Sequence, residues 1–472
     1  MPKRNLLLLA LITAISLVAW LARDYGRPAR QVAEVVAAID RAYFEPVDPA
    51  DLTAAALDGV MTRLDRHSAL VDGAARRELE ATLDQEFGGV GLELSPSPEG
   101  VTVHSPVAGG PAARAGIEAG DVIVSIDGVD VRRLSVRDAV EILRGDPGSS
   151  VIVGVRRPAE AQGVDGTAAG AEIRTLSLTR ELVRTESVLG DRRRPDGSWE
   201  WIVEGEPGIG VVRITSFGDR TPAEIDLALA AIAGTPGLRG LVLDLRGNPG
   251  GLLAAAVDVC DRFLDEGMIV ATRRRAATGV IVEPRRATPG SMLAGVPIAV
   301  LIDGLTASAA EIVAACLQDH GRAVVIGSRS FGKGTVQSIL PLSDGRRLLK
   351  LTTAEYLRPR EVGTEPHETD TAWGVSPDDG RTIDVTGRTL AALQAWRRPR
   401  DAAAAAARKP GADEPGSLGD LPRFVDPVLA AALGALSSPG AAHLRGEEET
   451  PRDADEAGPA GVAAGPDEGV GG

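Results

Sequence analysis

The sequence predicts a mixed α/β protein with a separate β-rich region, and three observations support this. From residue 209 onward, apolar strands alternate with helical segments, the pattern of βαβ units around a buried sheet. Residues 87–178 instead hold several strand-like runs near Gly or Pro and one short helical stretch. Residues 28–80 carry apolar residues at helical spacing. At 472 residues, the chain is also too long for one ordinary domain.

The α/β half is predicted element by element. Thr221-Pro222-Ala223-Glu224 fits a capping box with Pro at the first helical position, so a helix is expected from there to residue 232. The expected strands are residues 209–214, 241–245, 298–302, 323–326 and 335–341, and further helices are expected through residue 263 and over 308–317.

The regions before residue 209 show two other patterns, a helical one in residues 28–80 and a strand-like one in residues 87–178. Val32, Val35, Val36 and Ile39 recur at helical spacing, and a second helical pattern covers residues 54–61 after a break at two prolines. In the β-rich region, strands are expected over 101–103, 122–126, 151–155 and 173–178, with a short helix over 135–143 and a loop over 158–171.

Composition excludes some functions. The net charge of −15 argues against nonspecific nucleic-acid binding, which needs clustered positive charge. Residues 445–472 are acidic and rich in Gly, Pro and Ala, so a disordered tail is expected. Cys260 and Cys316 lie in apolar stretches and are expected to be buried free thiols. The histidines and cysteines have no metal-ligand spacing, so neither a metal nor another cofactor is expected.

The N-terminus reads as a membrane-targeting segment. Lys3 and Arg4 precede an uncharged run over residues 5–22, and Arg23 closes it. A small-x-small cleavage site is missing, which favours an uncleaved signal anchor over a signal peptide within residues 1–27. Because positive charge keeps that end cytoplasmic, most of the chain is expected outside the cytoplasm, attached to the membrane through this segment.

Lys333, between two glycines, fits three chemistries. A phosphate loop would need Ser or Thr after the lysine and a helix behind it, but Gly334 follows and residues 335–341 read as a strand. Ser330-Phe331-Gly332-Lys333 matches the penicillin-type S-x-x-K motif, yet the two glycines oppose the required helical turn. The third chemistry makes Lys333 the base for a serine brought near by folding.

Ser308 is the candidate serine, 25 positions before Lys333. Ser308-x-x-Glu311 also fits a plain helix cap, and the two roles are compatible. At a helix start the amide of Ala309 is unpaired and able to face an anion formed at Ser308. Lys333 would have to be desolvated to act near neutral pH, and Gln337, four residues on along a strand, would share its face.

A second glycine loop, Asp244-Leu245-Arg246-Gly247-Asn248-Pro249-Gly250-Gly251, follows a buried strand and precedes a helix. Adjacent glycines allow close approach of main chain to a ligand, although a simple strand-to-helix turn is an alternative.

Taken together, these motifs resemble the C-terminal processing peptidases, extracytoplasmic serine–lysine proteases that carry a PDZ domain. The resemblance covers about residues 30–395. It implies a crotonase-like ββα core with an inserted PDZ domain, Ser308 as nucleophile, Lys333 as general base and Gln337 holding the lysine. It also implies an oxyanion hole formed by the amides of Gly251 and Ala309. The motifs that carry it are residues 64–68, 87–92, 143–148, 214–217, 244–251, 306–311, 331–337 and 374–378.

The resemblance also sets expected boundaries and partners. The PDZ domain would cover 81–180 and bind a substrate C-terminal carboxylate at Gly89, Val90, Gly91 and Leu92. Protein substrates with accessible C-termini are therefore the expected partners, and a homo-oligomer is left open. The other predicted regions are an N-terminal helical region over 28–80, a protease domain over 181–398 and a C-terminal extension over 399–444.

Some features depart from the resemblance or compete with it. Residues 358–363 lack the stretch expected after the Tyr356 strand, and residues from 399 onward have no counterpart in the family, although residues 424–431 could add one helix. A noncatalytic binding protein on the same fold is the alternative from another functional class. A Ser-His-Asp hydrolase with His320 as base is another, but His320 lies 12 residues along the same helix, about 18 Å from Ser308.

Overall fold

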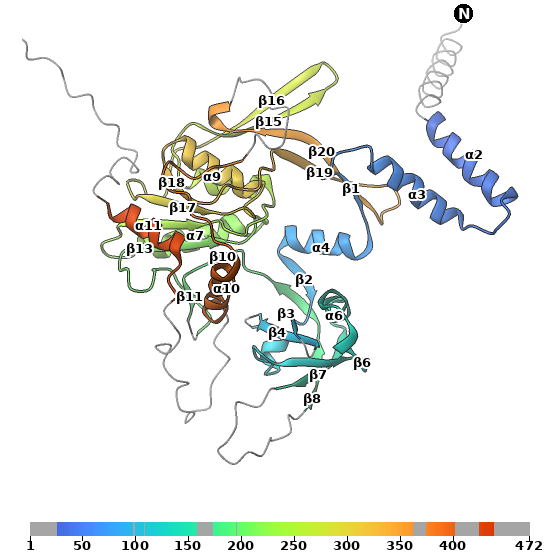
Figure 1. The fold of residues 1–472 in the computed structure, drawn as a ribbon, viewed down its shortest axis with the longest axis horizontal. Coiled ribbons are helices and arrows are strands. Elements are labelled where there is room, and N and C mark those ends of the chain that lie inside the picture. The colour runs from blue at the N-terminus through green and yellow to red at the C-terminus, as the bar shows by residue number, and fades with distance from the viewer. Residues whose placement is uncertain are drawn as a thin grey trace, which may run out of the picture.

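The computed structural model describes residues 26–97, 100–107, 109–157, 173–194, 196–361, 374–401 and 424–438. It has the predicted mixed α/β architecture, with a PDZ-like β domain and N-terminal helices (Figure 1). The predicted signal segment, the loop over 158–171 and the acidic tail lie outside the described residues. No described helix has both the length and the apolar character needed to cross a bilayer.

A five-stranded sheet forms the centre of the larger domain. Four of its strands run parallel and are buried along all or nearly all of their length, which explains why the sequence shows them as apolar runs. The sheet order is β10 (Val188–Leu189), β13 (Ile209–Ile214), β14 (Gly240–Asp244), β17 (Ile298–Ile302) and β18 (Ala323–Gly327), with β10 antiparallel to β13.

Helices cover both faces of this sheet. On one face, α7 (Thr221–Ala233), α8 (Leu253–Asp261) and α9 (Ala309–Asp319) pack against alternate strand residues such as Leu243. On the opposite face, α11 (Pro427–Ser437) packs against the intervening residues, such as Val242. Cys260 and Cys316 are free and buried in the first of these layers, as predicted.

The start of α7 differs from the prediction. Its N-cap residue is Arg220, with no side-chain cap, so the predicted capping box was wrong. The hydroxyl of Thr221 instead forms a hydrogen bond with the hydroxyl of Ser187. The Glu224 carboxylate accepts hydrogen bonds from the amides of Ser187 and Val188 at 2.8 and 3.2 Å. Both side chains therefore join the helix to β10 rather than cap the helix.

A second sheet lies beside the first and contains the strand that follows Lys333. Its order is β1 (Ala69–Val71), β20 (Leu348–Leu357), β15 (Met268–Ala276) and β16 (Gly279–Arg286), and β19 (Thr335–Pro341) also pairs with β20. The bounds of β19 confirm the predicted strand. The β15–β16 hairpin projects from the body (Figure 1). It was not predicted, because every residue of β16 is exposed and no buried alternation marks it.

The PDZ-like domain has its own core and sheet. The capping box of Ser135 and Asp138 starts the predicted helix α6 (Val136–Leu143). The short pair β2 (Glu86–Gly89) and β9 (Glu181–Arg184) joins this domain to the larger one. The sheet order is β3 (Leu92–Ser97), β4 (Gly100–Pro106), β5 (Val122–Ile126), β7 (Ser150–Arg156) and β8 (Ile173–Thr179), with β6 (Val129–Asp130) on β5, and with α5 (Pro111–Arg114) and a 3-10 turn over Val131–Arg133 nearby.

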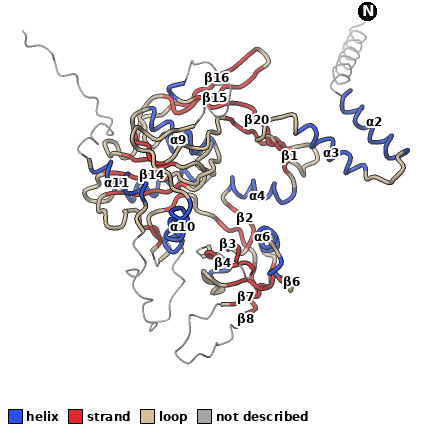
Figure 2. Tube along the Cα trace, in the orientation of Figure 1, coloured by secondary structure: helices blue, strands red, loops and turns tan. Residues whose placement is uncertain are grey.

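Helices dominate the N-terminal region, as predicted. α2 (Arg27–Ala42) and α3 (Pro49–Met61) have no buried residue and extend away from both domains (Figures 1 and 2). α4 (Gly73–Asp84) leads into β2, and β1 is a strand that the sequence did not reveal. The remaining elements are the pair β11 (Arg192–Arg193) and β12 (Trp199–Glu200), a 3-10 turn over Pro359–Glu361, and α10 (Gly387–Asp401).

Candidate active site

Ser308 stands at the sharp turn between β17 and α9. Its φ of 55° and ψ of −118° place a residue with a side chain in a region that favours glycine. Such strain persists only where surrounding structure enforces it, and it often marks a functional residue. The side chain is almost entirely buried. The turn resembles the strained strand-to-helix elbows that present nucleophiles in other hydrolases.

The carboxylate of Glu311 connects the serine and the lysine. It is fully buried and accepts hydrogen bonds from the amide of Ser308 at 2.7 Å and the amide of Lys333 at 2.8 Å, both on Oε2. Its other oxygen accepts from the Ser330 hydroxyl at 2.5 Å and the Gly332 amide at 2.7 Å. The residue predicted as a helix-capping partner therefore holds the two candidate catalytic loops together.

Lys333 is half-buried, and its surroundings act in the direction that a lysine base requires. Burial lowers the pKa of its ammonium, nearby Lys350 lowers it further, and Glu311 acts in the opposite direction. Among the described residues, its ammonium has no hydrogen-bond or ion-pair partner. A lysine in this environment favours the neutral amine more than a lysine in water does, and the neutral amine is the form that accepts a proton.

The surroundings of Gln337 differ from the expectation. Its amide donates to the hydroxyls of Thr335 and Thr352 at 2.9 and 3.2 Å. The same-face argument does not apply, because it holds within a strand and Lys333 precedes β19. That Gln337 holds the lysine stays a prediction.

The glycine loop approaches Ser308 closely. Gly250 has φ of 100°, and a Cβ there would lie 2.8 Å from the Ser308 Cβ. Gly251 has φ of 146°, and a Cβ there would lie 2.0 Å from the carbonyl oxygen of Phe217. Neither Gly251 nor Ala309 uses its amide in a hydrogen bond to another described residue. These two amides are the donors predicted for the oxyanion hole.

Buried hydrogen bonds fix the shape of this loop. The side chain of Asn248 donates to the Ile214 carbonyl and accepts the Gly250 amide, both at 2.8 Å. The Asn248 carbonyl accepts the Ala307 amide at 2.9 Å, next to the candidate nucleophile. Thr306 donates its hydroxyl to the Leu245 carbonyl at 3.0 Å. The two loops that flank Ser308 are thus bonded to each other.

Tyr356 is a site residue that sequence reasoning missed. It lies on β20, is almost fully buried, and forms a hydrogen bond with Ser308. Burial raises the pKa of its phenol to about 12, although the bond to Ser308 opposes the shift. The phenol therefore stays neutral at physiological pH beside the candidate nucleophile. Its position 48 residues after Ser308 carries no local signal that would have found it.

His320 does not serve as a base for Ser308. It is the C-cap residue of α9, and its ring nitrogen Nε2 lies 2.8 Å from the carbonyl oxygen of Met268. The helix keeps it at the end opposite Ser308, as its spacing predicted. The histidine alternative therefore has no support from the geometry.

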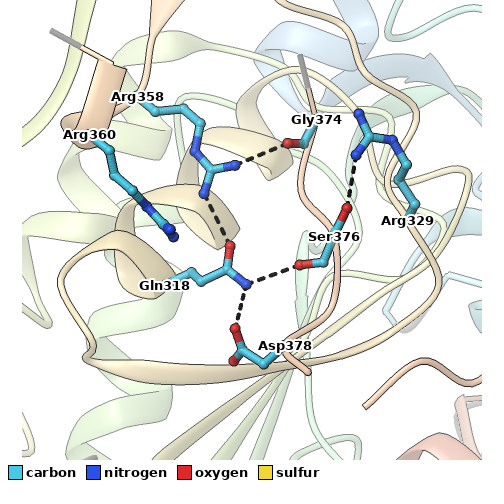
Figure 3. A pocket seen from close by; sticks show the side chains of 7 residues that line it. All are labelled: Gln318, Arg329, Arg358, Arg360, Gly374, Ser376 and Asp378. Carbon is cyan, nitrogen blue, oxygen red and sulfur yellow. Dashed lines mark hydrogen bonds between the residues drawn. The ribbon is translucent and has the colours of Figure 1, made fainter. Parts of the chain in front are cut away.

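A pocket of about 390 Å³ lies beside the lysine loop (Figure 3). One of its walls is Gly374, where a Cβ would lie 3.2 Å from the Cα of Gly332. Next to it, Val375 donates its amide to the Ser330 hydroxyl at 2.8 Å and accepts the Ser330 amide at 3.0 Å. The motif over residues 374–378 thus fixes the loop before Lys333. The pocket is lined by Gln318, Arg329, Arg358, Arg360, Gly374, Ser376 and Asp378.

The predicted carboxylate-binding residues lie at the entrance to β3. Val90 is buried and accepts the Ala112 amide through its carbonyl at 2.9 Å, while Gly91 has φ of 73° and accepts the Val107 amide at 3.0 Å. Gly89 ends β2, and Leu92 begins β3. β3 is the first strand in the order of its sheet, and α6 packs against it. An edge strand beside a helix is the arrangement to which PDZ domains add a peptide strand.

Comparison with known proteins identifies the family. The sequence profile of peptidase family S41 matches residues 208–379, and that of a PDZ domain matches residues 102–157. A carboxy-terminal-processing protease of Bartonella bacilliformis is 35% identical over 326 residues, which cover 68% of this chain and 68% of that protein. A carboxyl-terminal-processing protease of Picosynechococcus is 34% identical over 317 residues, covering 67% of this chain and 69% of that protein.

Among solved structures, a photosystem II D1 C-terminal processing protease aligns at 30% identity with a TM-score of 0.39, covering 79% of this chain and 97% of that one. The identity and coverage shared with the curated relatives exceed what a common fold alone would give. The chain therefore belongs to peptidase family S41 and carries a PDZ domain.

Proposed function

We propose that this protein is a serine endopeptidase that cleaves protein substrates near their C-termini, with Ser308 as nucleophile and Lys333 as base. The observation that best supports these roles is the buried Glu311 carboxylate, which accepts the amides of both residues on one oxygen. The desolvated lysine and the two unbonded amides beside Ser308 add to this support. The relatives named as C-terminal processing proteases support the site of cleavage.

In the proposed acylation step, the Ser308 hydroxyl oxygen attacks the scissile carbonyl carbon and its proton passes to the neutral amine of Lys333. The amides of Gly251 and Ala309 stabilise the resulting oxyanion. When the intermediate collapses, the carbon–nitrogen bond breaks, and the Lys333 ammonium returns the proton to the leaving amine. An ester on Ser308 remains.

In the proposed deacylation step, a water molecule attacks the ester carbonyl while Lys333 again accepts a proton. Collapse of the second intermediate breaks the ester, and Lys333 gives the proton to Ser308. A free lysine has a pKa near about 10.4, whereas a base at neutral pH works best near 7–8, so a shift of roughly 3 units, about 4 kcal/mol, is required. The direction of the shift in Lys333 agrees with that requirement.

The PDZ domain would select the substrate. The carboxylate of a C-terminus would meet the amides of residues 89–92, and the preceding residues would pair with the free edge of β3. The uncharged run over residues 5–22 between basic residues supports an extracytoplasmic location at a membrane.

Mass spectrometry of cleavage products tests the proposed reaction. Purified protein is incubated with an unfolded reporter protein that ends in apolar residues. The expected products are fragments released from the C-terminal part of the reporter, and Ser308→Ala should give none while keeping its melting temperature. Equal cleavage by Ser308→Ala would contradict the assignment of the nucleophile. Histidine at position 320 is a matched control, and His320→Ala should keep full activity.

A further inference from the structure

The C-terminal extension is connected to the candidate active site through the face of the parallel sheet that lies opposite α9. Its helix α11 covers the face of the parallel sheet opposite α7, α8 and α9 and packs on β14, β17 and β18. Val428, Ala432, Ala435 and Leu436 are buried in that contact. The N-cap residue of this helix, Asp426, binds Arg246 near the strand end that leads into the glycine loop.

Asp426 has two sets of partners. Its carboxylate caps α11 by accepting the amides of Val428 and Leu429 at 3.1 and 3.2 Å. The same carboxylate accepts both terminal nitrogens of Arg246, Nη1 at 3.0 Å and Nη2 at 2.8 Å. The two side chains are 2% and 5% exposed, so this two-point ion pair is shielded from water.

Arg246 is held from its other side by Asp244 at the end of β14. Nε and Nη2 of Arg246 donate to the two oxygens of Asp244 at 2.9 and 2.7 Å. Arg397 of α10 also contacts Asp244. Burial alone would raise the pKa of Asp244, but Arg246 and Arg397 hold it well below its usual range. Arg246 thus lies between two buried carboxylates, and Asp426 supplies one of them.

Arg246 lies near the start of the glycine loop, and Gly251, the candidate oxyanion donor, is the last residue of that loop. The next residue, Gly247, donates its amide to Asp303 at 2.9 Å, and Asn248 and Gly250 follow against the Ser308 turn. Removing one partner of a buried ion pair leaves the other charge uncompensated, and the surrounding chain then moves to relieve it. Here the chain directly after Arg246 is the segment that carries Gly250 and Gly251, so a displaced Arg246 would shift that segment.

We propose that Asp426 is a positioning residue for the peptidase reaction: through Arg246 it fixes the loop that places the Gly251 amide beside Ser308. This inference depends on the proposed role of Gly251 in the oxyanion hole. It gives the C-terminal extension, which the resemblance left without a role, a direct connection to the chemistry. Asp426 does not touch the substrate, so its removal should slow the reaction without weakening substrate binding.

The test compares Asp426→Asn with Leu436→Ala in the full-length protein. Asparagine keeps a helix cap but removes the charge that faces Arg246. We expect kcat on a fluorogenic peptide with an apolar C-terminus to fall about 10- to 100-fold with KM changed less than about twofold, as for partners that orient a reacting group. Affinity for a peptide boronic acid, whose serine adduct places an oxygen in the oxyanion hole, should fall by the same factor.

Leu436→Ala creates a cavity at the far end of α11 and controls for lost stability. It should lower the melting temperature by roughly 5–10 °C yet keep kcat at 25 °C. If Asp426→Asn keeps wild-type kcat and boronate affinity, the inference is wrong. It is equally wrong if kcat follows the loss of melting temperature in both variants, because the role is then structural only.

Two further variants keep the outcomes distinct. Should Asp426→Asn not fold, Asp426→Glu keeps the charge but displaces Arg246 by one methylene, and wild-type kcat in that variant would overturn the inference. Ser308→Ala is measured alongside. Turnover by Ser308→Ala would contradict the proposed function and this inference with it, whereas an inactive Ser308→Ala beside a fully active Asp426→Asn contradicts the role of Asp426 alone.

Discussion

At the peptidase site four donors converge on one buried carboxylate, Glu311, whereas β3 of the PDZ domain has one side without a neighbour among the strands that the structure describes. The loops that carry Ser308 and Lys333 are tied to each other by buried hydrogen bonds. The two domains, in contrast, are joined by the short β2–β9 pair and by contacts such as the Arg220 amide with Gln85 at 2.8 Å.

The difference teaches how the two tasks are divided. Catalysis needs atoms held to a fraction of an ångström, so the loops that carry the site are fixed by buried hydrogen bonds. Capture of varied C-termini needs a strand edge with main-chain donors, and among the described strands β3 lies at the edge of its sheet. Changes in the first region should therefore alter kcat, and changes in the second should alter substrate affinity.

Replacing the base, Lys333, should have the largest effect on kcat. Lys333→Met should reduce kcat by about 10⁴-fold or more, as the loss of a member of a catalytic pair does. The same change should raise the melting temperature at neutral pH, because burial of the ammonium opposes folding. Calorimetry across pH gives the check.

The sign of that stability change follows from linkage. The pKa of Lys333 is lower in the folded protein than in the unfolded chain, so folding is opposed at pH values below the folded pKa. The opposition fades as pH rises toward about 10.4, where the unfolded lysine also loses its proton. The gain from Lys333→Met should therefore shrink toward alkaline pH. A gain that stays constant with pH would contradict a desolvated lysine.

Breaking the Glu311 network should have the next largest effect. Glu311→Gln leaves a single acceptor oxygen, and its amide nitrogen faces some of the four donors without being able to accept from them. We therefore expect kcat to fall about 10²-fold and the melting temperature to fall by several degrees. Glu283→Gln on the exposed β15–β16 hairpin is the matched control and should change neither. An unchanged kcat in Glu311→Gln would show that the network does not position Ser308 and Lys333.

The PDZ region is tested without a mutation there. In the inactive Ser308→Ala protein, fluorescence anisotropy measures binding of a labelled peptide with an apolar C-terminus. Amidation of that C-terminus removes the charge that residues 89–92 are expected to meet and should weaken binding about 10-fold or more. Equal affinity for the free and amidated peptides would show that carboxylate recognition is not the function of this edge.

Replacing Lys350 should have the smallest effect, a shift in the pH dependence of kcat/KM. Its charge lowers the pKa of Lys333, so Lys350→Gln should raise that pKa and move the alkaline-rising limb of the kcat/KM profile upward by less than about one pH unit. Arg346→Gln, an exposed cation at the turn after β19, is the control. Identical profiles for wild type and Lys350→Gln would argue against Lys333 as the titrating base.

Local patterns could predict much of the fold and part of the site. Buried parallel strands such as β17 appear as apolar runs, and the glycines on both sides of Lys333 mark its loop. The register shift between Val336 and Gln337 was hidden, because such a shift leaves no periodic trace in the sequence. The contacts of Tyr356 and Asp426 join segments 48 and 180 residues apart, and no local pattern encodes them.

Covalent labelling tests the central claim, that Lys333 activates Ser308, most directly. The rate at which a fluorophosphonate labels the protein is followed across pH, with the modified residue mapped by mass spectrometry. We predict labelling of Ser308 that rises with pH through a midpoint well below about 10.4, the ordinary pKa of lysine, and that is lost in Lys333→Met. Labelling of another residue, or a rate on Ser308 that is the same in Lys333→Met, would contradict the account.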